Sequence, residues 1–400
     1  MKQEIVWKNA INLSDMKDFS RIIKIDIKPK IKQKLYKEAI KAIGSKRKLA
    51  RSIGYGYRNI DEWIKGNQDS IGLNIVKQLC DITSISLDNL QRTVIKIKTG
   101  KGGYFLKINF PFKVFNQNFV ELLIHVFGEG SAKLRAKKSI CYYNTDIELV
   151  NKVKMLSNNL FHPQKNYAIR KIYSMGDEIK CPNNKRTLAR KDELSLSLPN
   201  FIAYIILIHC SSLKEFKTIG ISNLILQVPD YYIPKIISAL IEDEGCVRCH
   251  NLVILTTKYK IVADVIKTRL EKLQIKSKLH YQRSFYDLVI TDLSSLKLLK
   301  TFIKVYNRKR NKIGMLIRIL SRPKANYYEV DKEILQFLSL RKKKYNATEV
   351  AWNIKRRKWI VSTALQRLQA KNLIKKESDL SRHGSFLYYN NNLTNDFHGS

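Results

Sequence analysis

The sequence predicts an α+β protein with an internally duplicated core between two shorter helical domains. Two apolar helices each end in Glu-Gly, at Glu129-Gly130 and at Glu244-Gly245, and the two glutamates lie 115 residues apart (244 − 129). After each Glu-Gly pair the sequence predicts a polar strand and then a helix in a similar position. This spacing suits a tandem duplication with one α/β unit per copy. Short amphipathic helices broken by turn signals occupy both ends of the chain.

The charge of the chain points to a polyanionic partner. Lys and Arg number 74 against 34 Asp and Glu, which gives a net charge of +40. Such a charge favours double-stranded DNA through counterion release. An anionic membrane surface is the competing partner, but the longest apolar run, 198–210, is shorter than the ~20 residues of a spanning helix. The first residues show no export signal, so we expect a cytoplasmic protein without membrane association.

Six scattered cysteines are too few for a disulfide scaffold, so we expect reduced thiols. Cys246 and Cys249 have C-x-x-C spacing, with His250 beside them. A zinc site needs four ligands, however, and no second pair completes it. The pair also lies in a predicted strand, where alternate residues face opposite ways. The sequence therefore argues against zinc.

After an N-terminal extension over 1–29, residues 30–98 read as a domain of short helices. The segment 45–54 carries a Leu/Ala/Ile face, and 57–66 follows after Gly-Tyr-Gly with an Ile/Trp/Ile face. These segments resemble the helix-turn-helix of the phage repressor and Cro family. The resemblance implies a recognition helix near 57–65, with Tyr57, Arg58 and Asn59 at its start as DNA contacts. The alternative is an ordinary helical bundle with a solvated basic face.

Residues 328–392 predict three helices and a closing strand at 386–389. The stretches 348–351 and 359–368 resemble the two helices of winged-helix regulators. Basic runs at 341–344 and 355–358 repel each other unless a polyanion is present. We therefore expect them on a phosphate-facing surface, with Lys355 and Arg356 as DNA contacts.

The duplicated core, over about 105–315, resembles the LAGLIDADG homing endonucleases. The segments 122–131 and 237–246 carry the resemblance, and the second copy continues it through 251–257 and 270–275. It implies two αββαββα repeats, 105–228 and 229–320, which form a DNA-binding saddle about a pseudo-twofold axis. Small residues are needed where the two motif helices meet. The second copy has Ser238 and Ala239 there, whereas the first has Leu-Ile-His at 123–125.

The resemblance also implies a chemistry. Glu129 and Glu244 would hold divalent cations, Mg²⁺ for example, against one scissile phosphate on each strand. A basic residue is expected near each centre, and Lys309 is the choice in the second copy. In the first copy the matching stretch, 217–222, has no convincing lysine after its glycine. A two-copy core needs no partner subunit, so a monomer on DNA is expected.

DNA contacts are expected on the strands after each motif, where alternate residues share a face. They are Lys133, Arg135 and Lys137 in the first copy, Arg248 and His250 in the second, and Arg308 and Arg310 farther on. The resulting prediction is a site-specific, metal-dependent double-strand endonuclease. One alternative is a transcription regulator that keeps the fold after cutting has decayed. Another is an RNA-binding splicing cofactor.

Overall fold

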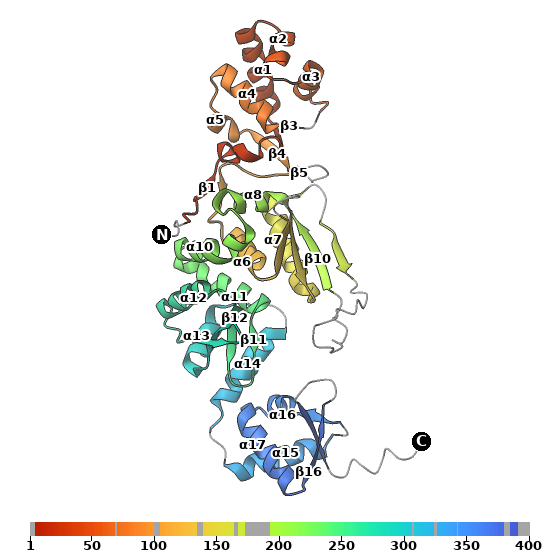
Figure 1. The fold of residues 1–400 in the computed structure, drawn as a ribbon, viewed down its shortest axis with the longest axis vertical. Helices are drawn as coiled ribbons and strands as arrows, with labels where there is room; N and C mark the ends of the chain where they lie inside the picture. The colour runs from red at the N-terminus through yellow and green to blue at the C-terminus, as the bar shows by residue number, and fades with distance from the viewer. Residues whose placement is uncertain are drawn as a thin grey trace, which may run out of the picture. The chain divides into compact units, whose positions relative to one another are not determined.

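The computed structural model describes residues 5–68, 70–99, 105–133, 139–163, 167–172, 193–305, 308–323, 326–341, 343–379 and 385–390. The chain divides into two compact units, Met1–Ala239 and Leu240–Ser400, and the division falls inside helix α11 (Ile233–Asp243). Figure 1 colours the first unit from red to green and the second from green to blue. Among the described residues, no single helix is long and apolar enough to cross a membrane. One sharply bent pair, Leu213–Gln227 with Asp230–Asp243, meets that test by length and composition only.

The first unit begins with a helical domain that follows the predicted pattern. Its helices are α1 (Pro29–Ile43), α2 (Lys46–Ser52), α3 (Tyr57–Lys65), α4 (Leu73–Thr83) and α5 (Leu87–Gln91). α1 starts with a proline in its first turn and ends at Gly44, whose φ of 96° suits glycine. The side chain of Ser45 caps α2 by accepting from the backbone N–H of Lys48. Trp63 and Leu49, both fully buried, carry the apolar faces of α3 and α2 into a common core.

This domain contains a β-sheet as well as helices, so the expectation of an all-α domain is wrong. A four-stranded sheet of order β3-β2-β4-β5 joins β2 (Ile23–Ile27), β3 (Ile71–Gly72), β4 (Val94–Thr99) and β5 (Phe105–Leu106). β2 and β4 pair antiparallel, and both alternate apolar and charged residues, the pattern of a half-buried strand. The first 29 residues are therefore not an appended extension, because they supply a central strand of this sheet.

The residues before β2 attach the helical domain to the first repeat. β1 (Ala10–Ile11) pairs with β6 (Phe112–Lys113), and the short helix η1 (Leu13–Phe19) follows. Trp7 is 2% exposed, and its indole Nε1 donates to the carbonyl of Gly220 at 2.7 Å. Its ring stacks on His209 at 4.3 Å between centroids. The N-terminal arm, residues 5–19, is thus part of the core of this unit.

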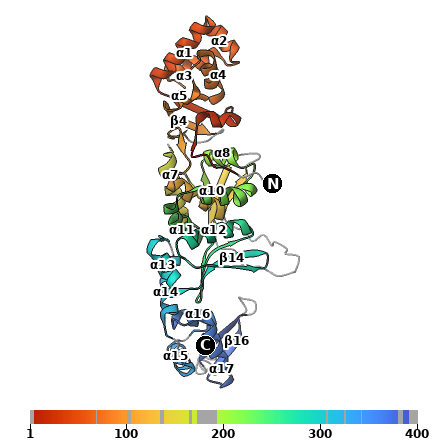
Figure 2. The same ribbon diagram turned by 90° about the vertical axis from the view of Figure 1, so that its left-hand side faces the viewer.

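The first repeat has the predicted αββαββα order. It runs through α6 (Gln117–Glu129), β7 (Gly130–Lys133), β8 (Ser139–Asn144), α7 (Ile147–Phe161), β9 (Ile169–Ile172), β10 (Glu193–Leu198) and α8 (Asn200–His209). A broken helix ends it, formed by α9 (Leu213–Glu215), the π-helical turn η2 (Phe216–Gly220) and α10 (Ile221–Gln227). The antiparallel sheet has the order β7-β8-β10-β9. Figure 1 shows α6 and α8 beside β10 of this sheet, and Figure 2 shows α7, α8 and α10 of the same repeat from the side.

The second repeat has the same order of elements. After the turn η3 (Asp230–Tyr232) come α11, β11 (Cys246–Val247), β12 (Leu252–Thr257), α12 (Lys260–Lys272), β13 (Lys278–Gln282), β14 (Phe285–Ile290), α13 (Leu293–Phe302) and α14 (Arg308–Ser321). Its sheet order, β11-β12-β14-β13, repeats that of the first sheet position by position. The α+β class and the duplication are therefore confirmed in the topology.

The first motif helix accommodates its large residues. Leu123, Ile124 and His125 in α6 are each fully buried. The ring of His125 lies edge-on to Tyr142 of β8, with centroids 5.9 Å apart. Glu121 in the same helix is 5% exposed and pairs with Lys152 at 2.8 Å and with Lys235 of α11 at 3.5 Å. An ion-pair network thus accompanies the apolar packing of α6.

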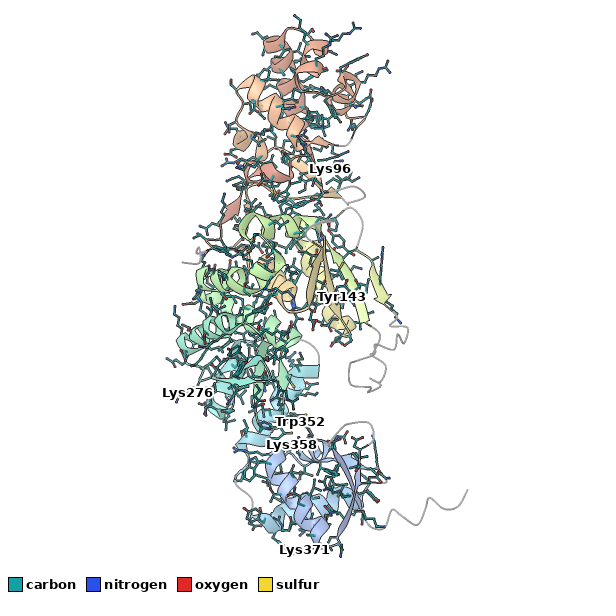
Figure 3. The ribbon with its side chains drawn as sticks, in the orientation of Figure 1. Lys96, Tyr143, Lys276, Trp352, Lys358 and Lys371 are labelled. Atoms are coloured by element: carbon teal, nitrogen blue, oxygen red, sulfur yellow. The ribbon has the colours of Figure 1, made fainter. Side chains whose placement is uncertain are left out.

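The second unit closes with a C-terminal domain of three helices and three strands. These are α15 (Tyr327–Ser339), β15 (Tyr345–Asn346), α16 (Ala347–Asn353), α17 (Lys358–Ala370), β16 (Ile374–Ser378) and β17 (Phe386–Asn390), with sheet order β15-β17-β16. Its hydrophobic core includes two residues of the second repeat, Cys249 and Ile319. Figure 3 shows Trp352 and Lys358 on the side of this domain nearer to the second repeat, and Lys371 away from it. The domain therefore shares a core with that repeat.

Candidate nucleic-acid interface

Both motif helices end at a glycine that tolerates no side chain. A Cβ on Gly130 would lie 2.2 Å from the carbonyl oxygen of Val126, and one on Gly245 would lie 2.6 Å from the Cα and carbonyl oxygen of Ile241. Separations under 3.0 Å of this kind require the backbone to shift. The chain can thus pass directly from helix to strand only with glycine at these positions.

The acids before these glycines occupy matching places. Glu129 is the last residue of α6 and is half-buried. Glu244 follows the last residue of α11, is also half-buried, and its backbone N–H donates to the carbonyl of Leu240 at 2.9 Å, which extends the helical pattern by one residue. Each repeat therefore places one carboxylate at the helix end that adjoins the first strand of its sheet.

Lys309 lies at the end of α11. Its Nζ donates to the carbonyl oxygens of Ile241 and Glu242 at 2.8 and 2.5 Å. Desolvation lowers the pKa of Lys309, although the nearby acids Asp243, Glu242 and Glu244 oppose this shift. A cation at a helix C-terminus satisfies orphan carbonyls and complements the helix dipole. The structure thus brings Lys309 to the motif helix that precedes Glu244.

In the first repeat a lysine occupies a comparable position along the chain. Lys217 follows Leu198, the last residue of β10, by 19 residues, as Lys309 follows Ile290, the last residue of β14, by 19. It is half-buried within η2 and comes before Gly220. The sequence prediction sought a lysine after that glycine. The matching distance along the chain from the last strand of each repeat to its lysine is the signal that would have identified Lys217.

The acids fit a cation that completes its coordination from the substrate. The part of the chain that the structure describes holds no group of three or more His, Cys, Asp or Glu placed to bind a metal ion. Mg²⁺ in phosphoryl-transfer sites commonly uses one or two carboxylates together with waters and substrate phosphates. Glu129 and Glu244, each with an oxygen ligand of the hard type that Mg²⁺ prefers, suit that mode. Cys246 and Cys249 are both free thiols, one exposed and one buried, so they do not converge.

The second sheet has one apolar face and one polar face. Leu255, Leu288 and Ile290 are fully buried on the side against the helices. On the other side, His280, Asp287 and Thr256 lie next to one another across β13, β14 and β12. The exposed side chains of this hairpin are mostly polar or basic: Lys278, His280, Gln282 and Arg283. An open, basic sheet face is the surface that a major groove admits.

Arg248 reaches this polar face from the turn after β11. Its Nη2 lies 3.6 Å from Oδ2 of Asp287, whose Oδ1 accepts from the Thr256 hydroxyl at 2.7 Å. His250 is exposed in the same turn and not on a strand, so the expectation that Arg248 and His250 share a strand face is wrong. The backbone turns because the Arg248 N–H donates to the carbonyl of Asn251. Partial desolvation, Arg248 and Lys358 lower the pKa of His250.

The first sheet has a comparable polar face. Its register places Tyr143 of β8 and Arg170 of β9 on either side of Ser195 in β10. Arg170 is exposed and Tyr143 half-buried, and Figure 3 labels Tyr143 on this sheet. Lys133 is the last residue of β7, where its backbone pairs with Ser139 of β8. Arg135 and Lys137 lie outside the described residues. Sequence reasoning missed Arg170, because its strand is separated from the motif by α7.

In the N-terminal domain, Tyr57, Arg58 and Asn59 are exposed side by side in the first turn of α3. A hydrogen bond to Tyr57 raises the pKa of Arg58, so its charge is held at all ordinary pH values. α3 is anchored from behind by Asp61, which accepts from the Tyr36 hydroxyl at 2.5 Å and pairs with Lys46 at 3.4 Å. The predicted contact residues thus project from a fixed helix.

Arg356 does not face solvent, contrary to the expectation that it contacts DNA. It is 7% exposed, and its guanidinium binds both carboxylate oxygens of Glu333 at 2.8 and 2.9 Å. Its neighbour Lys355 is exposed and has a φ of 55°, in the left-handed region. Arg310 is exposed on α14, and Arg308 is the first residue of that helix.

No family model and no curated protein matches the sequence. Among solved structures, full-length DUF199/WhiA from Thermatoga maritima is 10% identical, with 66% of this chain and 93% of that chain covered and a TM-score of 0.35. Mesophilic variants of the homing endonuclease I-DmoI are 14% identical, with 48% and 99% covered and a TM-score of 0.34. The N-terminal LAGLIDADG domain of DUF199/WhiA is 11% identical, with 50% and 89% covered and a TM-score of 0.32. Scores this low carry no argument about the function of this chain.

Proposed function

We propose that the protein is a site-specific endonuclease of the LAGLIDADG homing type, which binds duplex DNA and hydrolyses one phosphodiester bond in each strand with Mg²⁺. The observation that supports this most is the duplicated placement of a carboxylate. Each of two repeats with the same sheet order ends its motif helix in Glu-Gly, directly before a sheet with an open polar face. Two strands of a duplex require two such centres.

In this proposal Glu129 and Glu244 each hold a divalent cation against a phosphate. Such a cation would supply an activated water and would neutralise charge on the phosphate oxygens. Lys309 adds a fixed positive charge beside Glu244, because its hydrogen bonds to Ile241 and Glu242 set the position of its ammonium group. Lys217 has the corresponding role in the first repeat.

The two open sheet faces read the DNA. On the second sheet the contacts are Lys278, His280 and Arg248, with Asp287 fixing the direction of Arg248. On the first sheet they are Arg170, Tyr143 and Lys133. Guanidinium groups on a sheet bind guanine edges or phosphates. Tyr57, Arg58 and Asn59 of α3 act as the start of a recognition helix, and the C-terminal domain acts as a winged helix.

The second candidate is a DNA-binding regulator that has kept the fold without cleavage. The observation that favours it is the exposed first turn of α3, which offers Tyr57, Arg58 and Asn59 to a partner without any acid of the motif helices. Fold alone does not decide between the two functions.

The experiment is selection from a randomised duplex library with Mg²⁺, run on the parent chain and on Glu129→Gln and Glu244→Gln. These substitutions remove charge with little change of volume, and neither glutamate is fully buried. The endonuclease predicts cleavage by the parent, nicking or no cleavage by each variant, and unchanged binding in Ca²⁺. Selective binding without cleavage by the parent, unaffected by either substitution, would instead establish the regulator.

A further inference from the structure

Helix α14 carries a row of arginines that the sheet faces and the motif helices do not use. Arg310 and Arg318 are separated by two steps of four residues in α14, so they project from one side of the helix, and Arg322 directly follows its last residue, Ser321. Gly314 occupies the place between Arg310 and Arg318 in the same row. At ~1.5 Å per residue, Arg310 and Arg318 are about 12 Å apart along the helix axis.

Two hollows lie along this row and meet at Arg318. The first, of about 420 Å³, is lined by Lys300, Arg310, Gly314 and Arg318 among others. The second, of about 590 Å³, continues past Arg318 and Arg322 to Lys355 in the turn between α16 and α17. We call this surface, defined by Lys300, Arg310, Arg318, Arg322 and Lys355, the α14 groove. It joins the second repeat to the C-terminal domain within one compact unit.

The α14 groove has an excess of positive charge. Its one acidic lining residue in the described part of the chain, Glu333, is bound by Arg356 and Arg322. Arg322 is fixed further by a hydrogen bond from Nη1 to the carbonyl of Ile354 at 2.7 Å. Lys300, Arg310, Arg318 and Lys355 are exposed and form no ion pair with any described acid. A bound polyanion would relieve the repulsion among these cations more fully than mobile salt ions do.

Two details indicate that the groove is kept open and basic. A Cβ on Gly314 would meet only Lys300 Nζ, at 4.0 Å, so the glycine leaves space between the cations although glycine weakens a helix. Lys355 has a φ of 55°, which glycine adopts without cost and lysine does not. A lysine there places an ammonium group at the end of the row.

We propose that the α14 groove binds the sugar-phosphate backbone of duplex DNA, independently of base sequence. We take the partner to be the duplex of the proposed function. Guanidinium groups pair bidentately with its phosphate oxygens, and about 12 Å spans three to four nucleotides at ~3.4 Å of rise. The groove anchors the DNA between the second sheet and the C-terminal domain. This inference rests on the DNA binding in the proposed function but not on cleavage.

The first test uses a pair of isosteric substitutions in the full chain, Gly314→Glu and Gly314→Gln. Both replace a helical glycine by a better helix former, so both variants melt at or above the temperature of the parent. Binding to a selected duplex and to an unrelated duplex is measured by fluorescence anisotropy. Gly314→Glu is expected to weaken both affinities about tenfold or more, because its carboxylate competes for the cations. The affinities of Gly314→Gln should stay within about threefold of those of the parent. Equal affinities for the Gly314→Glu and Gly314→Gln variants would overturn the proposal.

The second test measures salt dependence. Arg310→Gln with Arg318→Gln is expected to reduce the slope of log affinity against log salt by about 2, at ~0.9 per lost phosphate contact. Sequence preference stays unchanged. Lys272→Gln with Lys371→Gln removes the same charge from exposed sites on α12 and after α17, and leaves the slope unaltered. An unchanged slope in the arginine variant, with binding by the parent, refutes the groove alone. If the parent does not bind duplex DNA, or if the arginines affect only RNA binding, the groove proposal falls, and in the first case the proposed function falls with it.

Discussion

The guanidinium of Arg356 donates hydrogen bonds to both carboxylate oxygens of Glu333, with Nη2 2.8 Å from Oε1 and Nε 2.9 Å from Oε2. Glu333 lies on α15 and Arg356 in the turn before α17, so the pair fixes the turn to the first helix of the domain. Arg356→Ala leaves a carboxylate without its main partner and is expected to destabilise the second unit by about 2 kcal/mol. Urea unfolding followed by circular dichroism measures this. Exposed Arg357→Ala is the matched control, and equal losses in the two variants would contradict the role of the pair.

The same pair makes stability depend on acid. Hydrogen bonds from Arg356 hold the pKa of Glu333 below its ordinary value. A carboxyl with a lowered folded-state pKa stabilises the fold above its unfolded-state pKa, and that contribution is lost as pH falls through the folded-state value. The urea midpoint of the parent should therefore fall below about pH 4.5 more steeply than that of Glu333→Gln. Parallel pH profiles for the two proteins would argue against the linkage.

Trp7 should be a large contributor to the stability of the first unit. It is 2% exposed and touches His209, Phe216 and Gly220, residues far along the chain. Trp7→Ala is expected to cost about 3 kcal/mol, the lower end for a buried aromatic. Thermal unfolding checks this, with Val6→Ala, whose side chain is 69% exposed, as the neutral neighbour. A melting temperature equal to that of the control would show that the N-terminal arm is not part of the core.

His209 should make the N-terminal arm sensitive to mild acid. Its Nε2 accepts from the backbone N–H of Lys8 at 3.1 Å, and its Nδ1 lies 2.8 Å from the carbonyl of Ile205, so the neutral ring fits both partners. Burial lowers the pKa of His209 from 6.5. Stability should thus be complete above pH 6.5 and decline below it, because the unfolded chain binds the proton more readily. Hydrogen exchange at residues 5–19 between pH 7 and 5 measures this, and exposed His280→Gln should leave the profile unchanged while His209→Gln flattens it.

Replacing either motif glycine, Gly130 or Gly245, by alanine should destabilise the fold. A Cβ at position 130 would lie 2.2 Å from a backbone oxygen, and one at 245 would lie 2.6 Å from backbone atoms. Gly130→Ala and Gly245→Ala are each expected to cost about 2 kcal/mol or more, since backbone must move. Gly314→Ala should raise stability by up to about 1 kcal/mol, as in any open helix interior. Differential scanning calorimetry of the three variants measures these changes in stability. A change in the same direction for all three variants would refute the steric argument.

Arg58 should contribute to DNA binding and not to folding. It is exposed at the start of α3. Arg58→Ala is expected to weaken binding to a selected duplex by about 1–3 kcal/mol and to relax preference at one position, if it contacts a base. Lys77→Ala, exposed on α4, removes the same charge from the same domain and should change affinity less. Competition binding against single-base variants of the duplex makes the comparison.

The duplication was predictable from sequence because its signals are local. Apolar helices ending in Glu-Gly are visible as strings, and the steric demand at Gly130 and Gly245 explains why the glycines stand there. The short strands β2 and β4 were missed even though they alternate, because β2 falls in the segment 1–29 that was taken as an extension and helix signals dominate residues 30–98. Their pairing joins residues about 70 positions apart, which no local pattern reveals.

Charge patterns were less informative than periodicity. The run 355–358 looks uniform in the sequence, yet Arg356 is buried against Glu333 while Lys355 is exposed with a positive φ. Which members of a basic run meet solvent depends on a long-range partner, here one 23 residues away. For the same reason, the arginines of α14 gain significance only when the hollows beside them are known.

Cys249 and Ile319 belong to the second repeat but complete the core of the C-terminal domain. Separating the C-terminal domain from the second repeat would therefore expose apolar surface on both fragments, and a foreign domain put in its place would need apolar side chains that fit Cys249 and Ile319.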